Sequence, residues 1–377
     1  MVLPYINHLS ALLQGFIFIP LGILGIGFLI GIHEFGHFLF AKIFNVRIPS
    51  FSIGFGPKLL SKKIGETEFS ISAIPLGGYV EIAGAAEIGQ GEQKEAHATD
   101  ERSFAAKPFY QKLCIMLGGI AVNLLFAYIA ITGLFITGIP KTPLISVPVI
   151  SIIHAQSPAD LYELKIGDRI IAINNEMVDN NMQRLQEIIQ PLADKNALLT
   201  IERNGQTIYK SIVIGSKTTD INTAIGFLGV EFDITETPPH GLIQAIQKGI
   251  STTNQWIKNT LIGFTKIKQN KGQLAGPIMI IAMTTKAASA GLKIFILLLA
   301  IISINLAVLN ILPLPILDGG QIFFYGIEAL IRRPLPEKTR EYIHIATWIL
   351  FLILILYLST KDIIRLAMPY IETLLQR

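Results

Sequence analysis

The amino-acid sequence predicts a polytopic α-helical membrane protein that also carries a folded segment of mixed helix and strand. Of its 377 residues, 51% are hydrophobic and only 15% are charged, whereas a soluble domain carries about 25% charged residues. The mean hydropathy is +0.53. Four apolar stretches each approach the length of about 20 residues that spans a bilayer. This composition excludes a disordered chain, and the single cysteine, Cys114, excludes a disulfide-stabilised one.

The predicted transmembrane helices are residues 16–44, 113–139, 294–317 and 343–359, the last extending toward residue 364. The first segment differs from a cleavable signal peptide. Residues 1–41 contain no Lys or Arg, a small-residue cleavage site is missing, and the apolar run is too long. We therefore expect this segment to remain as a membrane helix.

The basic residues predict the orientation of these helices. Lys and Arg collect in residues 45–112 and 332–341, whereas the N-terminal tail has none. Because basic loops stay in the cytoplasm, both loops are expected there, with both termini and residues 140–290 outside. Lys361 and Arg365 oppose this bias slightly. The net charge of +4 fits the same pattern, and nucleic-acid binding is excluded because no basic stripe with interleaved aromatic residues occurs.

The region outside the membrane has the pattern of a small α+β domain. The elements expected from turn signals and apolar runs are, in order, a Gly167-Asp168 turn, a strand at 169–173, a helix at 182–189, and strands near 198–202 and 208–214 that flank an Asn204-Gly205 hairpin turn. This order resembles a circularly permuted bacterial PDZ domain, here residues 140–216. Such a domain captures extended peptides or protein C-termini by strand addition. The alternative is an α+β domain without a ligand.

Two further segments have recognisable periodicity. Apolar residues recur at near-helical spacing over 239–270, which predicts an amphipathic helix at the outer membrane interface or, alternatively, one packed on the PDZ-like domain. On the cytoplasmic side, residues 51–57 and 68–79 are typical of strands that pair as a hairpin. Non-helical backbone at membrane depth needs protein or a water-filled cavity to satisfy its polar groups. The polar segment 86–101 is expected to be a flexible loop.

The main chemical signal is an HExxH motif made by His33, Glu34 and His37 within the first apolar segment. Residues i and i+4 lie on one face of a helix, so the two imidazoles can bind one Zn²⁺ while the glutamate acts on the bound water. Ionisable side chains inside a membrane segment are costly and indicate function. The alternative is a polar cluster at the helix end whose side chains reach water.

A catalytic zinc site needs a third protein ligand and one open position. Asp318 is favoured, because it terminates the third apolar helix, which runs in the same direction as the first and brings both motifs to similar depth. Pro313 and Pro315 cannot continue a regular helix and would expose backbone groups beside the metal. Alone, Asp318 would be a helix-boundary residue. The other histidines are isolated: His8, His97, His154, His240 and His344.

These residues together resemble the site-2 protease family, in particular the bacterial zinc metalloproteases of regulated intramembrane proteolysis. The resemblance covers nearly the whole chain. It is carried by the motif at 33–37, the segments 54–56 and 75–79, Gly119 with Asn123, the PDZ-like domain, Gly276-Pro277 and the run 310–320. Two departures occur: Ile120 stands where the family often has proline, and one PDZ-like unit is present where some relatives have two.

The resemblance implies roles for ten residues. The zinc ligands would be His33, His37 and Asp318, with Glu34 as the catalytic acid and base. The residues that hold an unwound substrate would be Asn310, Pro313 and Pro315, together with Gly54, Phe55 and Gly56 of a membrane re-entrant β-loop that adds a strand to the substrate.

The expected fold is therefore four transmembrane helices, a cytoplasmic re-entrant β-loop segment and one extracytoplasmic PDZ-like α+β domain, in a bacterial inner (cytoplasmic) membrane. The expected segments are helix one at 1–45, the cytoplasmic loop with the β-segment at 46–112, helix two at 113–139, the PDZ-like domain at 140–216, a linker with interfacial amphipathic helices at 217–290, helix three at 291–331, and a cytoplasmic loop, helix four and C-terminal tail at 332–377.

The expected function is zinc-dependent hydrolysis of a peptide bond in the transmembrane segment of a single-pass membrane protein or in a signal-peptide remnant. The resemblance implies that another protease usually trims the substrate first. A helical substrate hides its carbonyls in backbone hydrogen bonds, so it must unwind locally. Two alternatives stay open: a catalytically inactive membrane scaffold that presents the PDZ-like domain, and a transporter, which no inverted repeat supports.

Overall fold

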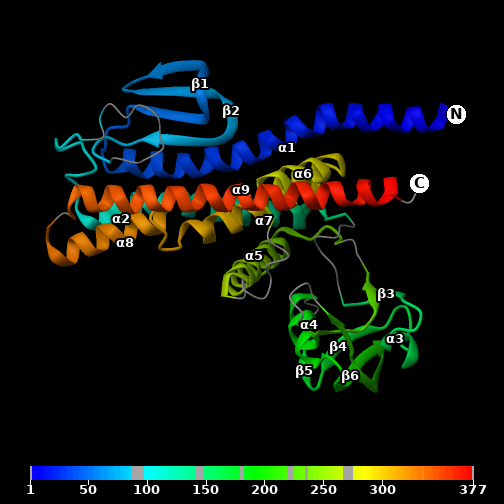
Figure 1. Ribbon diagram of the computed structural model, residues 1–377. Helices are drawn as coiled ribbons and strands as arrows, with labels where there is room; N and C mark the ends of the chain where they lie inside the picture. Colours follow the sequence, from blue (N-terminus) through cyan, green and yellow to red (C-terminus); the bar gives the residue numbers. More distant parts are fainter. Residues whose placement is uncertain are drawn as a thin grey trace. The chain divides into compact units, whose positions relative to one another are not determined.

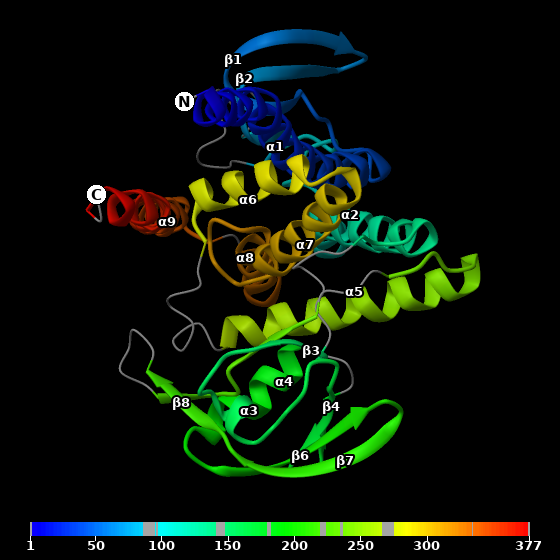
Figure 2. The same ribbon diagram turned by 90° about the vertical axis from the view of Figure 1, so that its right-hand side faces the viewer.

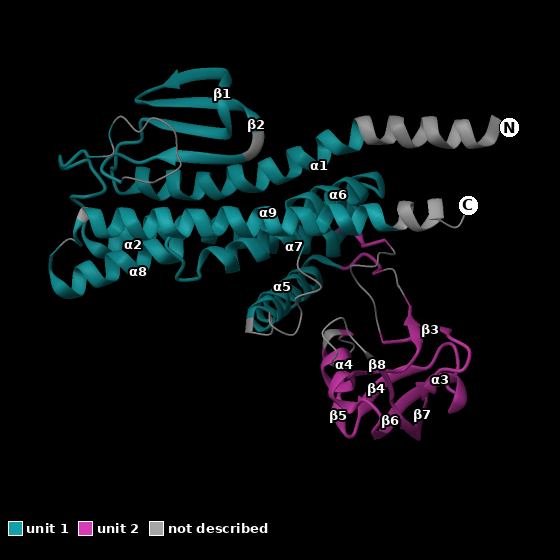
Figure 3. Cartoon of the chain, in the orientation of Figure 1, with its two compact units in different colours: residues 1–136, 241–377 teal, residues 137–240 magenta. Residues whose placement is uncertain are grey.

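The computed structural model describes residues 2–85, 95, 97–140, 148–178, 182–218, 224–233, 237–265, 275–333 and 335–375. The chain divides into two compact units, residues 1–136 with 241–377 and residues 137–240 (Figure 3). Long helices dominate the first unit, and short strands dominate the second (Figure 1). Most of the loop predicted at 86–101 lies outside the described residues.

The first unit is a bundle of apolar helices. Its helices are α1 (Val2–Ile43), α2 (Phe109–Thr137), α5 (Leu242–Thr265), α6 (Pro277–Ser289), α7 (Leu292–Asn310), α8 (Asp318–Ile331) and α9 (Glu337–Leu375). In the described part of the chain, four segments are long and apolar enough to cross a membrane: Ile17–Ile43, Phe109–Thr137, Leu292–Asn310 and Lys338–Met368. They agree with the four segments that the sequence predicts.

The third predicted helix is shorter than expected. We expected it to run from 294 to 317 and to end at Asp318, but α7 ends at Asn310 and Asp318 begins a new helix, α8. Between them, Leu317 N–H donates to the Leu314 carbonyl in a local turn. Two closely spaced prolines in this segment remove backbone donors and clash with a preceding helical turn. The segment 311–317 is therefore an irregular connection that positions Asp318 at a helix start.

Helix α6 is held at its start by a buried carboxylate from α9. Asp362 has no exposed surface, and it accepts hydrogen bonds from the backbone N–H groups of Gly276 (3.1 Å) and Met279 (2.9 Å). The first N–H groups of a helix lack partners within the helix, and their partial positive charge favours an anion. Helix α6 also packs against α1 and α7 (Figure 2). It is thus an element of the bundle, whereas the sequence placed 217–290 in a linker and interfacial helices.

Helix α5 has the amphipathic character expected from the sequence. On one face Ala245 and Thr253 are buried, and Thr260 Oγ1 donates a hydrogen bond of 2.9 Å to Asn305 Oδ1 of α7. Elsewhere on the helix, apolar side chains such as Ile243 are exposed. The helix therefore packs within its own unit on one side and leaves apolar surface on the other. Residues 266–270 of the predicted helix lie outside the described residues.

Strands β1 (Ser50–Ile64) and β2 (Thr67–Glu81) pair antiparallel, as the sequence predicts for the two glycine-interrupted runs. The pairing is more elaborate than a simple hairpin, because Ser50 pairs with both Glu68 and Glu81. The beginning of β1 therefore lies inside the sheet, between two parts of β2. The sheet lies along α1, and it contacts that helix mainly through β2 (Figure 1).

An ion-pair cluster fastens the β1–β2 turn to the end of α1. The Glu66 carboxylate lies 2.6 Å from Lys42 Nζ of α1 and 2.7 Å from Arg102 Nη2. These hydrogen bonds, first that of Lys42 and then that of Arg102, lower the pKa of Glu66 despite its partial burial. The turn thus stays close to α1 while the rest of the hairpin extends along the helix.

The second unit contains a four-stranded antiparallel sheet of order β5-β4-β6-β7 and a helix beside it. Its elements are β3 (Ile150–Ile153), α3 (Pro158–Leu161), β4 (Arg169–Ile173), β5 (Glu176–Met177), α4 (Met182–Ile189), the 3₁₀ helix η1 (Gln190–Leu192), β6 (Asn196–Arg203), β7 (Gln206–Val213), β8 (Gly215–Thr218), β9 (Ala224–Phe227) and β10 (Val230–Phe232). The buried core is aliphatic and includes Ile173, Leu185 and Leu199. The predicted strand 169–173 and helix 182–189 coincide with β4 and α4.

One detail of this unit, its β6–β7 turn, follows from a short-range signal in the sequence, and another, the extent of the unit, does not. Asn204 (φ 52°) and Gly205 (φ 77°) join β6 to β7 in a two-residue turn, the conformation that Asn-Gly favours. The unit continues beyond the expected end at residue 216, because β10 returns to pair with β3. Pairing between segments so far apart in sequence leaves no local signal in the chain.

A buried ion pair gives the second unit a testable dependence on pH. Asp168 is fully buried, accepts from Lys165 N–H (2.8 Å) and lies 2.6 Å from Arg203 Nε. Burial alone would raise the pKa of Asp168, but the hydrogen bonds from Arg203 and Lys165 outweigh it and lower the pKa. A carboxyl group with a lowered pKa in the folded state stabilises the fold above its unfolded pKa of about 3.9 and loses that contribution as pH falls.

We therefore expect Asp168→Asn to destabilise the second unit by roughly 2 kcal/mol at pH 7, the scale of a hydrogen bond to a charged group. The difference from the wild type should shrink as pH falls below about 4. Hydrogen–deuterium exchange of β4 and β6 in the whole chain measures both effects. Equal protection of the two proteins at pH 7 would contradict the prediction.

Candidate metal centre

Three ligating side chains from distant parts of the chain meet within unit 1. His33 and His37 lie one turn apart on α1 and are buried, and Asp318 lies at the start of α8. His33 Nε2 is 3.2 Å from His37 Nε2 and 3.2 Å from Asp318 Oδ2, and His37 Nε2 is 3.5 Å from Asp318 Oδ1. Their ligand atoms all lie within 4.8 Å of one another. The structure thus brings together the three residues that the sequence singles out as ligands.

The donor set fits a catalytic zinc ion. Two imidazoles and one carboxylate leave one position of a tetrahedral ion open for water, the arrangement of catalytic zinc sites. Asp318 Oδ2 is buried, and the polar atom beside it is Nε2 of His33, itself a candidate ligand; a buried carboxylate oxygen is costly unless a cation satisfies it. Of the other described histidines, His154 lies beside Glu231 and His344 beside Gln321, and neither belongs to this group.

Helix α2 supplies the surface on which both imidazole rings rest. His37 Nδ1–H donates a 2.8 Å hydrogen bond to the Ile115 carbonyl, which leaves Nε2 free to bind a metal. One turn further along, a Cβ atom on Gly119 would lie 2.5 Å from His37 Nε2 and 2.6 Å from His33 Cε1. Asn123, another turn along, has its Nδ2 atom 3.1 Å from His33 Nδ1. Gly119 is the middle one of these three positions on α2, and only glycine fits there.

The same two helices cross at very short range. A Cβ atom on Gly36 would lie 2.2 Å from the Gly118 carbonyl oxygen, and one on Gly118 would lie 2.6 Å from the Gly36 carbonyl oxygen. Small residues permit close backbone approach between membrane helices. Gly36 inside the HExxH motif is thus not interchangeable with larger residues, since it permits the close approach of α1 to α2.

Glu34 projects from α1 toward the end of β2. The backbone of Val80 donates a hydrogen bond to its carboxylate, and a Cβ atom on Gly78 would lie 3.4 Å from Glu34 Cγ. Glu34 therefore lies between the ligand pair and a strand. The HExxH spacing indicates the role of Glu34, but the strand beside it could not be derived from that spacing.

The residues expected to hold substrate lie in two places. Asn310 is buried, with its Nδ2 atom 3.1 Å from His33 Nε2, so it borders the metal site. Gly54 (φ 93°) and Gly56 (φ 84°) form a bend in β1, and Phe55 lies against Gly77 of β2. The part of β2 that contacts Glu34 is at Gly78, whereas Gly54 contacts the backbone of Ser72 and Ile74, earlier in the same strand.

A hydrogen-bonded chain that the sequence did not suggest supports the segment 311–317. Gln321 Nε2 donates to the Pro315 carbonyl (3.0 Å) and faces His344 Nε2 (3.2 Å), while Arg340 Nη2 donates to Gln321 Oε1 (2.8 Å). Arg340 also stacks on the Tyr325 ring at 4.9 Å. Helix α9 thereby supports the segment that precedes Asp318. His344 appears isolated in the sequence because its partners come from another helix.

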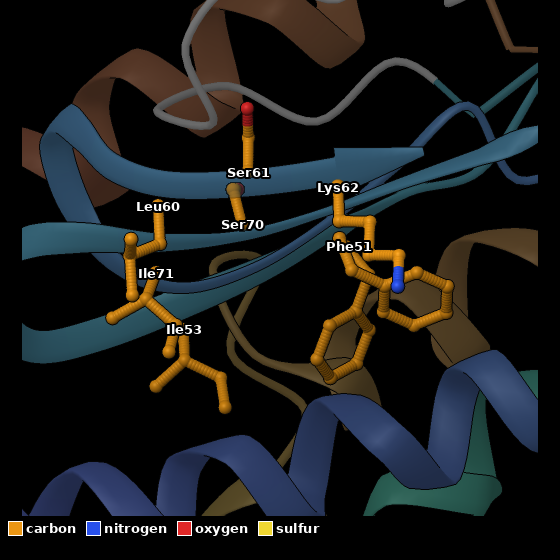
Figure 4. Close-up of a pocket in the computed structure, with 8 residues that line it drawn as sticks. Phe51, Ile53, Leu60, Ser61, Lys62, Ser70 and Ile71 are labelled. Carbon is orange, nitrogen blue, oxygen red and sulfur yellow. The ribbon is translucent and has the colours of Figure 1, made fainter. Parts of the chain in front are cut away.

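A cavity of about 390 Å³ lies on the face of the β1–β2 sheet that looks toward α1 (Figure 4). Its walls are mainly apolar and consist of Phe51, Ile53, Leu60, Ser61, Lys62, Phe69, Ser70 and Ile71. The cavity shares no residue with the histidine and aspartate cluster. None of the three candidate ligands lines it, so it is a space separate from the metal centre.

Comparisons with known proteins agree with this site. The model of a family described as Peptidase family M50 matches residues 21–355. A protein of Clostridium perfringens named "putative zinc metalloprotease" is 30% identical over 355 residues, which cover 92% of this chain and 98% of the relative. A Helicobacter pylori protein of the same name is 32% identical over 364 residues, 91% of this chain and 98% of the relative. A Nostoc protein, also named a putative zinc metalloprotease, is 30% identical over 360 residues, which cover 92% of this chain and 97% of the relative.

Proposed function

The chain belongs to peptidase family M50, and from this premise we propose that it is a zinc metalloendopeptidase that cleaves peptide bonds within the membrane. The convergence of His33, His37 and Asp318, with Glu34 beside them, carries the proposal. Its intramembrane character rests on the location of the motif in the span Ile17–Ile43. Charged and ligating side chains at such depth are rare unless they serve a function.

Zinc bound by these three residues would lower the pKa of a water molecule and polarise the substrate carbonyl. Glu34 lies where it can take the proton from the attacking water as general base. It then gives that proton to the amine nitrogen of the leaving peptide as general acid. The hydrogen bond from the Val80 backbone holds the Glu34 carboxylate in place between these two transfers.

The proposed substrates are transmembrane segments of single-pass membrane proteins, or signal-peptide remnants. Such helices must unwind before a carbonyl becomes available. Strand β2 beside Glu34 can pair with an extended segment by backbone hydrogen bonds, as in strand addition. The Asn310 amide and the irregular backbone at Pro313 and Pro315 offer polar groups to the same segment. The bend at Gly54, Phe55 and Gly56 shapes the sheet that receives it, and we propose that this sheet is re-entrant in the membrane.

We propose further that the second unit is a PDZ-like domain that binds peptides or protein C-termini. Its antiparallel sheet, the adjacent helix α4 and the predicted order of elements support this assignment. Binding of a peptide with a free C-terminus and its amidated counterpart by the purified chain distinguishes the possibilities. Equal binding of the two peptides would contradict capture of a C-terminus, and binding of neither would favour a domain without a peptide ligand.

The proposed orientation places the metal centre toward the cytoplasm and both termini and the second unit outside, in the bacterial inner membrane. The basic residues of the loops at 45–112 and 332–341 support it. Single cysteines introduced into each unit, with Cys114 replaced, can be labelled in intact cells with an impermeant maleimide. Labelling of residues in the loop 45–112 rather than the second unit would contradict this orientation.

The metal site itself is tested by Asp318→Ala. Loss of one of three ligands should weaken zinc binding by more than about 100-fold. Changes to residues that only hydrogen-bond to a ligand cost about 10- to 100-fold in metal affinity. Zinc content and competition with a chelator, measured on the purified chain, give the result. Glu328→Ala removes another carboxylate from the same helix, one that accepts from Leu335 N–H, and should leave zinc affinity unchanged. An unchanged affinity in Asp318→Ala would remove Asp318 from the ligand set.

A further inference from the structure

The two histidine ligands are supported differently by α2. His37 is oriented by a backbone carbonyl, that of Ile115, which can only accept a hydrogen bond. His33 instead faces the side-chain amide of Asn123, two turns further along the same helix and completely buried. Ile115, Gly119 and Asn123 follow one another at intervals of four residues, so they lie on one face of α2. On that face Ile115 and Asn123 contact the Nδ1 atoms of His37 and His33, and Gly119 lies between them, close to both rings.

The hydrogen-bond chemistry around His33 fixes how the Asn123 amide must point. Asn123 Nδ2 lies 3.1 Å from His33 Nδ1, and Asn310 Nδ2 lies 3.1 Å from His33 Nε2. An imidazole ring offers at most one acceptor nitrogen, because the other carries a proton. Two amide N–H groups therefore cannot both be satisfied by this ring.

The unpaired atom in this arrangement indicates that the amide of Asn123, rather than that of Asn310, has its oxygen and nitrogen exchanged. Asn123 Oδ1 is buried and has no hydrogen-bond partner, a state that costs roughly 1–3 kcal/mol. The two ends of an amide have nearly the same shape, and their assignment follows from the hydrogen-bond network. With the amide rotated by half a turn, Oδ1 lies where it accepts from His33 Nδ1–H, and Nε2 becomes the unprotonated nitrogen.

We infer that Asn123 is a positioning residue that holds His33 with its Nε2 lone pair directed at the ligand cluster. This inference rests on the proposed zinc site. Asn123 would do for His33 what the Ile115 carbonyl does for His37, since a partner on the far nitrogen sets the tautomer and orientation of a ligating histidine. Ser303 Oγ of α7 donates to the Asn123 backbone carbonyl (3.0 Å) and secures that part of α2 without touching its amide.

Three variants of the whole chain, purified in detergent, separate this role from a structural one. Asn123→Leu keeps the volume but removes the acceptor, so its zinc dissociation constant should rise about 10- to 100-fold. Asn123→Asp keeps an oxygen acceptor at the same place and should bind zinc as tightly as the wild type. Ser303→Ala removes the packing contact to the backbone and should leave zinc affinity unchanged. Chelator competition measures all three, and thermal unfolding of the zinc-loaded proteins checks their folding.

Wild-type zinc affinity in Asn123→Leu would overturn the inference, and so would equal losses in Asn123→Leu and Ser303→Ala. If Asn123→Leu does not fold, weak zinc binding by Asn123→Asp would overturn it in the same way. A wild-type chain that binds no zinc would instead overturn the proposed metal site, and this inference with it. Tight binding by the wild type and a selective loss in Asn123→Leu would support both.

Discussion

Replacing Glu34 with Gln is expected to stop peptide cleavage while zinc stays bound. The two side chains have nearly the same shape, and the Gln carbonyl oxygen can still accept the hydrogen bond from the Val80 backbone. The amide cannot take a proton from water or return it to the leaving amine. Since general acid–base catalysis contributes about 100- to 10,000-fold, and Glu34 would serve in both proton transfers, we expect the rate to fall by at least about 100-fold.

The rate is measured on a model single-pass substrate under single-turnover conditions, with zinc content determined on the same preparation. Glu202→Gln makes the same chemical change on the second unit, where Glu202 lies near Arg169, and it should cleave at the wild-type rate. Undiminished cleavage by Glu34→Gln would rule out the enzyme mechanism proposed above. Loss of both zinc and cleavage would instead place Glu34 among the residues that hold the metal.

The same variant identifies substrates in the cell. Membrane proteomes of cells with the wild-type chain and with Glu34→Gln are compared for truncated single-pass proteins. An inactive enzyme that still binds its substrates should let such fragments accumulate. If the chain is a scaffold rather than a protease, the two proteomes should be the same.

Replacing Gly119 with Ala is expected to damage the metal site through a single methyl group. The added Cβ atom would lie 2.5 Å from His37 Nε2 and 2.6 Å from His33 Cε1, about 1 Å closer than ordinary contact distance. Both rings must move or α2 must retreat, and a misplacement of about 1 Å in a catalytic constellation costs about 100-fold in rate. We expect a loss of that size in cleavage, with weaker zinc binding.

Gly133 provides the matched control on the same helix. A Cβ atom there meets no atom within 4 Å, so Gly133→Ala makes the same change without steric conflict and should preserve zinc binding and cleavage. Thermal unfolding of both variants separates a local effect on the site from a general loss of stability. Equal activity of Gly119→Ala and Gly133→Ala would show that the rings tolerate the methyl group.

The sequence predicts the chemistry of the site better than its surroundings. The spacing of His33 and His37 on an apolar helix is a local pattern, and a carboxylate at Asp318 after a membrane segment is conspicuous because charge is scarce there. The helical periods and the Asn204-Gly205 turn are also local signals. Each of these depends on residues close together in the chain, so each can be derived without the fold.

The supporting structure depends on contacts that leave no such pattern. Ile115 contributes a backbone carbonyl, which every residue possesses, and Gly36 and Gly118 contribute only the absence of a side chain. The hydrogen bonds of Gln321 and Arg340 join α8 and α9 to the segment 311–317, and no local pattern in the sequence indicates these partners. Pro313 and Pro315 do indicate a break in the helix before Asp318, but the new helix α8 that begins at Asp318 was not predicted.

The proposed ligands at positions 33 and 318 lie far apart in the sequence. An ion held by both would join α1 to α8 as a cross-link, in addition to being a reagent. Anything that binds only the folded state stabilises it by an amount that grows with the logarithm of its free concentration, about 2.7 kcal/mol at 100 times the dissociation constant. The stability of the helix bundle would then depend in part on the supply of metal, so that a cell short of zinc would weaken the fold of this protein as well as its chemistry.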